Sequence, residues 1–84
     1  MGNENLRRLL ESELEWPNRY RFKFVIPVAQ RDVLVGLLQD AELSFRESKG
    51  GRYVSVTAEM EMTSPDEVLE VYERVQGIEG LMSL

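Results

Sequence analysis

Apolar and polar side chains alternate without a break from Arg52 to Met62. Successive side chains of a β-strand point to opposite faces of a sheet, so a period of two predicts a strand whose two faces differ. One face is expected to be buried and the other to meet solvent. The residues expected inside are Val54, Val56, Ala58, Met60 and Met62, and those expected outside are Tyr53, Ser55, Thr57, Glu59 and Glu61.

A second segment with the same period covers residues 19–28. Its outward positions include Arg21, Lys23 and Val25, and Pro27 stands near its end. The pattern predicts a half-buried strand. The residues expected on its buried side are Tyr20, Phe22, Phe24 and Ile26.

Two shorter strands are predicted, at residues 43–48 and 81–84. In the first of them, Leu43 and Phe45 are expected to face the core. The four residues 48–51 end in two glycines, which a hairpin turn needs for positive φ. We therefore expect the strand at 43–48 to pair with the long alternating strand through this turn.

Three segments show the three- and four-residue apolar spacing of an amphipathic helix. They cover residues 4–15, residues 30–41 and the stretch from Ser64 to Gly77. In the second, Gly36 is expected to permit a close approach to the sheet. The apolar positions are Leu6, Leu9, Leu10 and Leu14, then Val33, Leu34, Leu37, Leu38 and Ala41, and finally Val68, Leu69, Val71, Tyr72 and Val75.

The start of the third helix carries capping residues. Ser64 is the expected N-cap, Pro65 suits the first helical position, and Glu67 completes a capping box. Glu70 and Arg74 are spaced to pair across one turn. Gly77 is the expected C-terminal stop. The acidic side chains expected to form the solvated face of this helix are Asp66, Glu67, Glu70 and Glu73.

The elements after residue 15 spell βαββαβ, which is the ferredoxin-like plan. We expect an α+β, two-layer sandwich in which two helices cover one face of an antiparallel sheet with strand order 4-1-3-2. Residues 1–15 are expected to form an N-terminal amphipathic helix. Residues 16–84 are expected to form a single domain.

The composition excludes several classes of site. The 84 residues contain no cysteine and no histidine. Disulfides, thiolate nucleophiles and cysteine-ligated zinc are therefore ruled out, and so are the usual neutral-pH general base and the commonest transition-metal ligand. We expect no enzymatic activity, no cofactor and no metal.

Charge and hydropathy also bear on the partners. With 10 basic and 15 acidic side chains the net charge is −5, which makes nucleic acid an unlikely main partner. No stretch approaches the roughly 20 apolar residues of a membrane span, and the N-terminus lacks the features of a signal peptide. We expect a cytoplasmic protein with no membrane association.

The uncovered face of the two long strands is the candidate interaction face. Arg21 and Lys23 are expected to stand beside Glu59 and Glu61 and to form cross-strand ion pairs that keep the surface soluble. The full set of candidate residues is Arg21, Lys23, Arg52, Tyr53, Ser55, Thr57, Glu59 and Glu61.

A candidate ligand loop follows the first strand. It covers residues 27–32, and Pro27, Gln30 and Arg31 are its candidate contacts. Loops that hold anions or amino acids generally use glycine so that backbone N–H groups reach the ligand, and this loop contains none.

Four blocks of sequence together resemble a known family. They are Trp16–Phe24, Ser48–Thr57, Ser64–Val68 followed by Val71 and Tyr72, and Leu81–Leu84. In this order they resemble the YbeD-like family of small bacterial domains of unknown function, over about residues 14–84. The resemblance implies an ACT-like ferredoxin fold and no particular reaction. The turn glycine typical of amino-acid-binding ACT domains is absent after Ile26.

Three functional hypotheses follow. The leading one is a non-enzymatic regulatory or protein-interaction module that acts through its sheet face or edge, by forming a homodimer or by docking on a larger cytoplasmic protein. The first alternative is an ACT-like sensor of a small molecule of the amino-acid type. The second is a weak RNA-binding domain that uses Arg21, Lys23, Arg52 and Tyr53.

Overall fold

A computed structural model of the chain describes residues 2–84, with side chains from Glu4 onward. The described part is α+β, with a four-stranded antiparallel sheet and helical segments before and between the strands. The elements are α1 (Gly2–Glu13), β1 (Asn18–Pro27), the 3-10 turn η1 (Val28–Gln30), α2 (Arg31–Leu37), β2 (Glu42–Glu47), β3 (Tyr53–Met62), α3 (Pro65–Val75) and β4 (Met82–Ser83).

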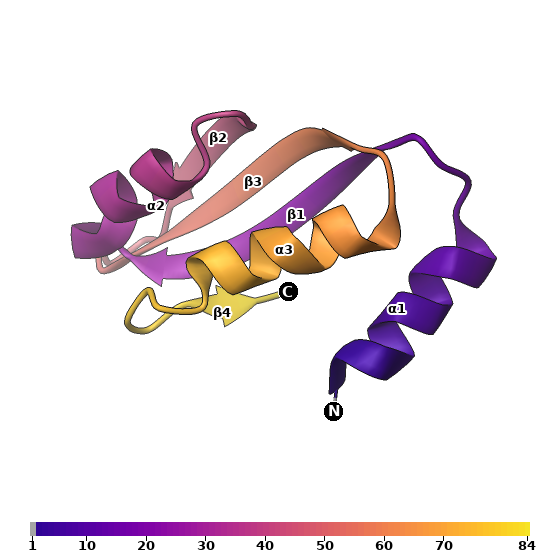
Figure 1. Cartoon of the computed structure of the whole chain (residues 1–84). Coiled ribbons are helices and arrows are strands. Elements are labelled where there is room, and N and C mark those ends of the chain that lie inside the picture. The colour runs from indigo at the N-terminus through magenta and orange to yellow at the C-terminus, as the bar shows by residue number, and fades with distance from the viewer. Residues whose placement is uncertain (1) are drawn as a thin grey trace.

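The strands lie in the order β2-β3-β1-β4, which is 4-1-3-2 when counted from the β4 edge. β1 and β3 are the central pair, and they run antiparallel from Asn18 opposite Met62 to Pro27 opposite Tyr53. Figure 1 shows α2 and α3 along one face of this sheet. The order after α1 is the βαββαβ order expected from the sequence.

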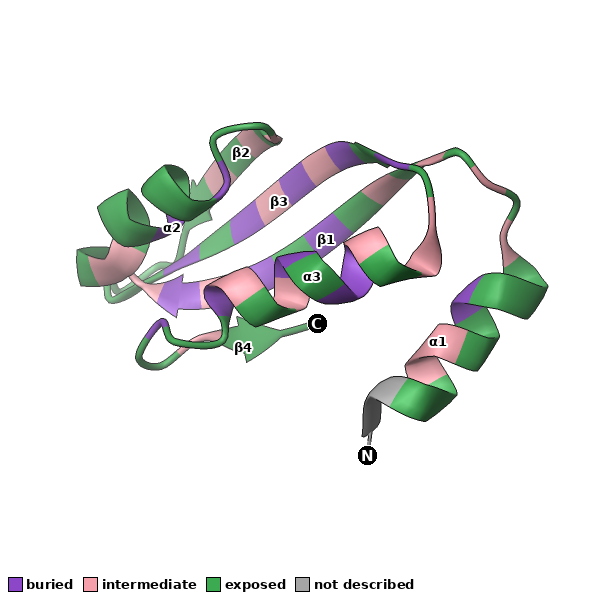
Figure 2. Cartoon of the chain, in the orientation of Figure 1, coloured by how far each residue is buried: buried purple, intermediate pink, exposed green. Residues whose placement is uncertain are grey.

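The core lies between the sheet and these helices. Burial alternates along β1 and β3 as predicted, and Figure 2 shows the alternation as bands along both strands. The ring of Tyr72, on α3, packs edge-on against Phe22 at 5.3 Å and Phe24 at 6.1 Å between centroids. The fully buried side chains of the two strands and α3 include Phe22, Phe24, Ile26, Val54, Val56, Val68, Val71 and Val75.

The predicted helix cap and hairpin turn form, but the carboxylate of Glu67 accepts from a different backbone N–H than a capping box predicts. The backbone N–H of Glu67 donates to Oγ of Ser64, so Ser64 is the N-cap of α3. The carboxylate of Glu67 accepts from the backbone N–H of Thr63 at 2.7 Å, one residue before the position usual in a capping box. Gly51 has a φ of 71° in the β2–β3 hairpin, as predicted.

α1 docks on the rest of the fold beside α3. Leu10 is buried in the core cluster, and Leu6 and Leu14 pack against that cluster. Trp16 Nε1 donates to the carbonyl of Leu10 at 3.2 Å, and Arg7 pairs with Asp66 at the start of α3. The apolar stripe predicted for this helix is therefore the side that packs, although Leu9 stays exposed.

The second helix is shorter than predicted, and two of its expected core residues are wrong. The helix ends at Leu37 and residues 38–40 form a turn, so α2 has about two turns and presents only Leu34 to the sheet, followed by Leu38 at its end. Val33 is 49% exposed and Leu37 is 37% exposed. A Cβ added to Gly36 would meet open space, so this glycine does not mark a close approach to the sheet.

The glycine that the backbone requires near the C-terminus is Gly80. It has a φ of 81°, and a Cβ added there would lie 2.8 Å from Cγ of Pro27. α3 ends at Val75 with Gln76 as C-cap, so the predicted stop before Gly77 is right. Gly77, however, is not among the positive-φ residues of the described chain.

Candidate functional site

We call the face of the sheet that is turned away from α2 and α3 the open face. Its residues follow from the cross-strand register, because directly facing residues of an antiparallel pair share a face. They include Arg19, Arg21, Lys23 and Val25 on β1, Tyr53, Ser55, Thr57, Glu59 and Glu61 on β3, and Glu42, Ser44 and Arg46 on β2.

One half of the open face is held by ion pairs centred on Glu59. Its carboxylate accepts from Arg21 at 2.9 Å and from Arg19 at 3.2 Å, and Arg19 also reaches Glu42 at 3.5 Å. The hydrogen bonds from Arg21 and then Arg19 hold the pKa of Glu59 below its ordinary value. Both arginines of this half are therefore paired with carboxylates within the chain.

The cross-strand ion pairs predicted from the sequence form only in part. Arg21 pairs with Glu59 as predicted, but Lys23 stands opposite Thr57, which carries no charge. Glu61 stands opposite Arg19, whose guanidinium turns instead to Glu59 and Glu42. The register decides the outcome for Lys23, which is two residues beyond Arg21 and so faces the residue two before Glu59.

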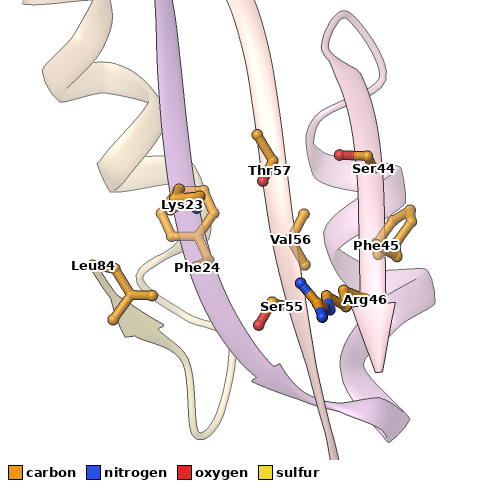
Figure 3. A pocket seen from close by; sticks show the side chains of 9 residues that line it. All are labelled: Lys23, Phe24, Ser44, Phe45, Arg46, Ser55, Val56, Thr57 and Leu84. Atoms are coloured by element: carbon orange, nitrogen blue, oxygen red, sulfur yellow. The ribbon is translucent and has the colours of Figure 1, made fainter. Parts of the chain in front are cut away.

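The other half of the open face contains a hollow of about 330 Å³. Its walls are Lys23 on β1, Ser55 and Thr57 on β3, and Ser44 and Arg46 on β2. Leu84 closes it on the β4 side, and Phe24, Phe45 and Val56 complete its lining. Figure 3 shows the side chain of Arg46 extending across β3 toward Ser55, and the hydroxyl of Ser44 directed toward Thr57.

Seven of the eight residues predicted for the interaction face share the open face, and Arg52 is the exception. Arg52 precedes β3, its carbonyl accepts from the N–H of Val28 at 2.9 Å, and by alternation it lies on the other side from Tyr53. The prediction missed Arg19, Glu42, Ser44 and Arg46. The alternation of Leu43 and Phe45 with polar residues was the signal for those on β2.

The three residues of the candidate ligand loop have different places in the fold. The guanidinium of Arg31 lies over the ring of Phe45, 4.2 Å from its centroid, so it is engaged in a cation–π contact. Pro27 is the last residue of β1 and packs against Gly80. Gln30 ends the 3-10 turn before α2.

Arg74 does not form the predicted pair with Glu70. It pairs with Asp40 at 3.2 Å and donates to the carbonyl of Leu37 at 3.5 Å, so it ties α3 to the end of α2. A second hollow of about 180 Å³ lies there, lined by Asp40, Glu61, Met62, Glu67, Glu70 and Arg74. Within residues 4–84, no group of three or more candidate ligand side chains is arranged to hold a metal ion.

Fold and surface define a small α+β domain with one covered and one uncovered sheet face. The family model described as a protein of unknown function, DUF493, matches residues 11–84. The chain therefore belongs to this family, the YbeD family, as the resemblance in its sequence implied. No curated protein and no solved structure matches the chain significantly. No helix in the described residues is long and apolar enough to span a membrane.

Proposed function

We propose that the protein is a non-enzymatic regulatory or protein-interaction module that pairs with a second copy of itself along strand β2. β2 is an edge of the sheet, so one side of its backbone has no neighbouring strand in the described chain. A further strand can add to such an edge through main-chain hydrogen bonds. The observation that carries the proposal is that β2 complements itself when two copies run antiparallel.

The hydrogen-bonding pattern identifies which residues of β2 face the free edge. The backbone N–H of Ser48 donates to the carbonyl of Tyr53 at 2.9 Å, and the β2–β3 register continues from there without interruption. Bonded and non-bonded pairs alternate along an antiparallel ladder, so Leu43 and Phe45 turn their backbone groups away from β3. The backbone of Leu43 is therefore free to exchange two hydrogen bonds with the backbone of Phe45 in a second copy.

An antiparallel pairing centred on Ser44 also matches the side chains on both faces. On the open face it places Glu42 of each copy opposite Arg46 of the other, and on the helix face it places Leu43 opposite Phe45. Opposite charges and apolar pairs at facing positions each stabilise by a few tenths to about 1 kcal/mol. In the adjacent allowed registers Glu42 or Arg46 would face Ser44, and the charge match would be lost.

Apolar surface beside β2 supports the same pairing. Leu43 and Phe45 are only partly buried, and Arg31 of α2 lies over Phe45. Val35 follows Arg31 by one helical turn, so it lies on the same side of α2, and it is 39% exposed. A second copy along β2 would bring its own α2 alongside and remove apolar surface from water.

We also propose an ACT-like fold, a role without catalysis and a cytoplasmic location. The βαββαβ order and the β2-β3-β1-β4 sheet support an ACT-like version of the ferredoxin-like fold. The lack of histidine and cysteine supports a role without catalysis. A chain without cysteine needs no oxidising compartment to fold, which supports a cytoplasmic location.

Sedimentation velocity over a concentration series tests the pairing. Arg46→Glu places a carboxylate opposite the partner's Glu42 in both symmetric positions. Two attractive pairs become repulsive, so the dimer Kd is expected to rise by about tenfold. Both side chains are exposed, so the variant is expected to fold as the wild type does.

The matched control is the double variant Glu42→Arg, Arg46→Glu. It restores opposite charges at the same two positions and is expected to return the Kd close to the wild-type value. The internal contact of Glu42 with Arg19 that it removes is exposed and contributes little. A wild type that stays monomeric at millimolar concentration, or a double variant that associates as weakly as the single one, contradicts the proposal.

A further inference from the structure

We infer that the hollow on the open face is a binding site for the phosphate group of a small phosphorylated molecule. The hollow is formed within one chain, by Lys23, Ser44, Arg46, Ser55 and Thr57 around a floor of strand backbone. The inference concerns a ligand and so goes beyond the pairing along β2. Three observations carry it: the charge state of the walls, the placement of their hydroxyls, and the size of the space.

The first observation is that the two cations of the hollow are the uncompensated ones on this face. Arg19 and Arg21 are neutralised by Glu59 and Glu42. Within residues 4–84, neither Lys23 nor Arg46 takes part in an ion pair. A phosphate group would receive charge-assisted hydrogen bonds from both, and the planar guanidinium of Arg46 suits two-point contact with its oxygens.

The second observation is that hydroxyl donors lie between the two cations. Thr57 stands directly opposite Lys23 on one side and Ser44 on the other, and Ser55 stands opposite Arg46. The cations therefore approach from β1 and β2, and the hydroxyls of Ser55 and Thr57 rise from β3 between them (Figure 3). A hydroxyl can donate to a phosphate oxygen, and no aspartate or glutamate side chain is among the lining residues of the hollow.

The third observation is that the hollow is larger than one phosphate group needs. Its volume of about 330 Å³ falls at the low end of the range of small-molecule pockets. On the β4 side its wall is the exposed aliphatic side chain of Leu84, whose backbone N–H is bonded to the carbonyl of Lys23. A compact organic group attached to the phosphate would rest on this apolar side.

An NMR titration with inorganic phosphate and with phenyl phosphate tests the inference, using the full chain and sodium chloride of equal ionic strength as the reference. We expect saturable shifts of the backbone amides at the five polar wall residues with both ligands. Phenyl phosphate is expected to bind more tightly than inorganic phosphate, because its ring contacts Leu84. Equal affinities would identify the ligand as free phosphate and overturn the assignment of an organic ligand.

Two variants with the same charge change separate a site from general attraction. Lys23→Gln removes a wall of the hollow and is expected to weaken phosphate binding by about tenfold. Lys49→Gln removes an exposed charge in the hairpin turn and is expected to change it by less than about twofold. Equal losses in the two variants, or shifts no larger with phosphate than with chloride, overturn the inference.

The hydroxyls provide an independent check. Thr57→Val keeps the shape of the side chain and removes its donor, so it is expected to weaken binding while the shifts of the remaining wall residues persist. An unchanged phosphate affinity in this variant would show that the Thr57 hydroxyl does not contact the phosphate. Because β2 pairing is read by sedimentation and phosphate binding by amide shifts, the failure of either proposal is seen separately.

Discussion

Ala58 lies directly opposite Phe22 across the central strand pair, and both side chains are completely buried. On its other side Ala58 faces Leu43 of β2. A small residue therefore sits between two large ones in the middle of the sheet. The ring of Tyr72 packs on Phe22 from the helix layer, so the space beside Ala58 is bounded by side chains from both layers.

Ala58→Leu is expected to destabilise the fold by about 1–3 kcal/mol. The added atoms have no space between Phe22 and Leu43, so neighbouring side chains must leave their preferred rotamers. Urea unfolding followed by circular dichroism measures the free energy of unfolding. The same change at the exposed Ala29 is the control, and it is expected to stay within about 0.5 kcal/mol of the wild type. Equal losses at the two positions would refute the argument from packing.

Two glycine substitutions are expected to act in opposite directions. Gly80→Ala forces an L-residue to a φ of 81° and places its Cβ 2.8 Å from the ring of Pro27, so we expect a loss of stability well above 1 kcal/mol. Gly36→Ala adds a methyl group in open space within α2, and we expect a gain of up to about 1 kcal/mol. Thermal unfolding of both variants beside the wild type measures the contrast. A stabilising Gly80→Ala would show that the contact with Pro27 relaxes.

The sequence predicts the long strands well because burial on one face enforces their register. A slip by one residue would expose Val54 and Val56 and bury Glu59, so the alternation leaves one solution. The same reasoning places seven of the eight candidate residues on the uncovered side of the sheet. It does not predict which residues pair, since the partner of Lys23 depends on how β1 is aligned with β3.

The parts that sequence reasoning missed depend on contacts between distant segments. The requirement for glycine at position 80 comes from the ring of Pro27, which is far away in the chain. α2 ends where Leu38 leaves the helical conformation, and an apolar spacing that continues to Ala41 does not reveal this end. Arg46 and Ser44 lie on a short strand, and their role in the hollow follows only once β2 is placed beside β3.

Stability is expected to fall in alkaline solution because of Tyr72. Burial, together with the neighbouring Tyr20, raises the pKa of Tyr72 to about 12 in the folded protein, from 10.0 for the free side chain. The folded state therefore holds this proton more tightly than the unfolded state. Stability from this group is complete below pH 10.0 and is lost as the pH rises toward about 12.

The measurement is urea unfolding at several pH values between 9 and 12. Tyr72→Phe keeps the ring against Phe22 and Phe24 and removes the ionisable group, so the alkaline loss is expected to become shallower. Tyr53→Phe is the control, because Tyr53 is exposed on the open face. This variant is expected to show the same dependence of the free energy of unfolding on pH as the wild type. Identical profiles for the wild type and Tyr72→Phe would assign the alkaline loss to another group.

Arg46 belongs both to the hollow and to the edge along which two copies pair. A phosphate group in the hollow and the partner's Glu42 would compete for the same guanidinium. Phosphate is therefore expected to weaken self-association, and by linkage self-association must weaken phosphate binding by the same factor. This competition would give the module a ligand-dependent change of assembly, which is the regulatory behaviour proposed for it.

Sedimentation of the wild type in phosphate and in chloride at equal ionic strength measures the coupling. We expect the dimer Kd to rise by about three- to tenfold in saturating phosphate, the range for a coupling of roughly 1 kcal/mol. At a phosphate concentration that half-saturates the wild type, Lys23→Gln is expected to remove most of the effect, and in chloride it is expected to leave the Kd unchanged, because β3 separates Lys23 from the paired edge. If phosphate occupies the hollow and the dimer Kd stays constant, Arg46 does not contact both the phosphate and the second copy, and the proposed competition is wrong.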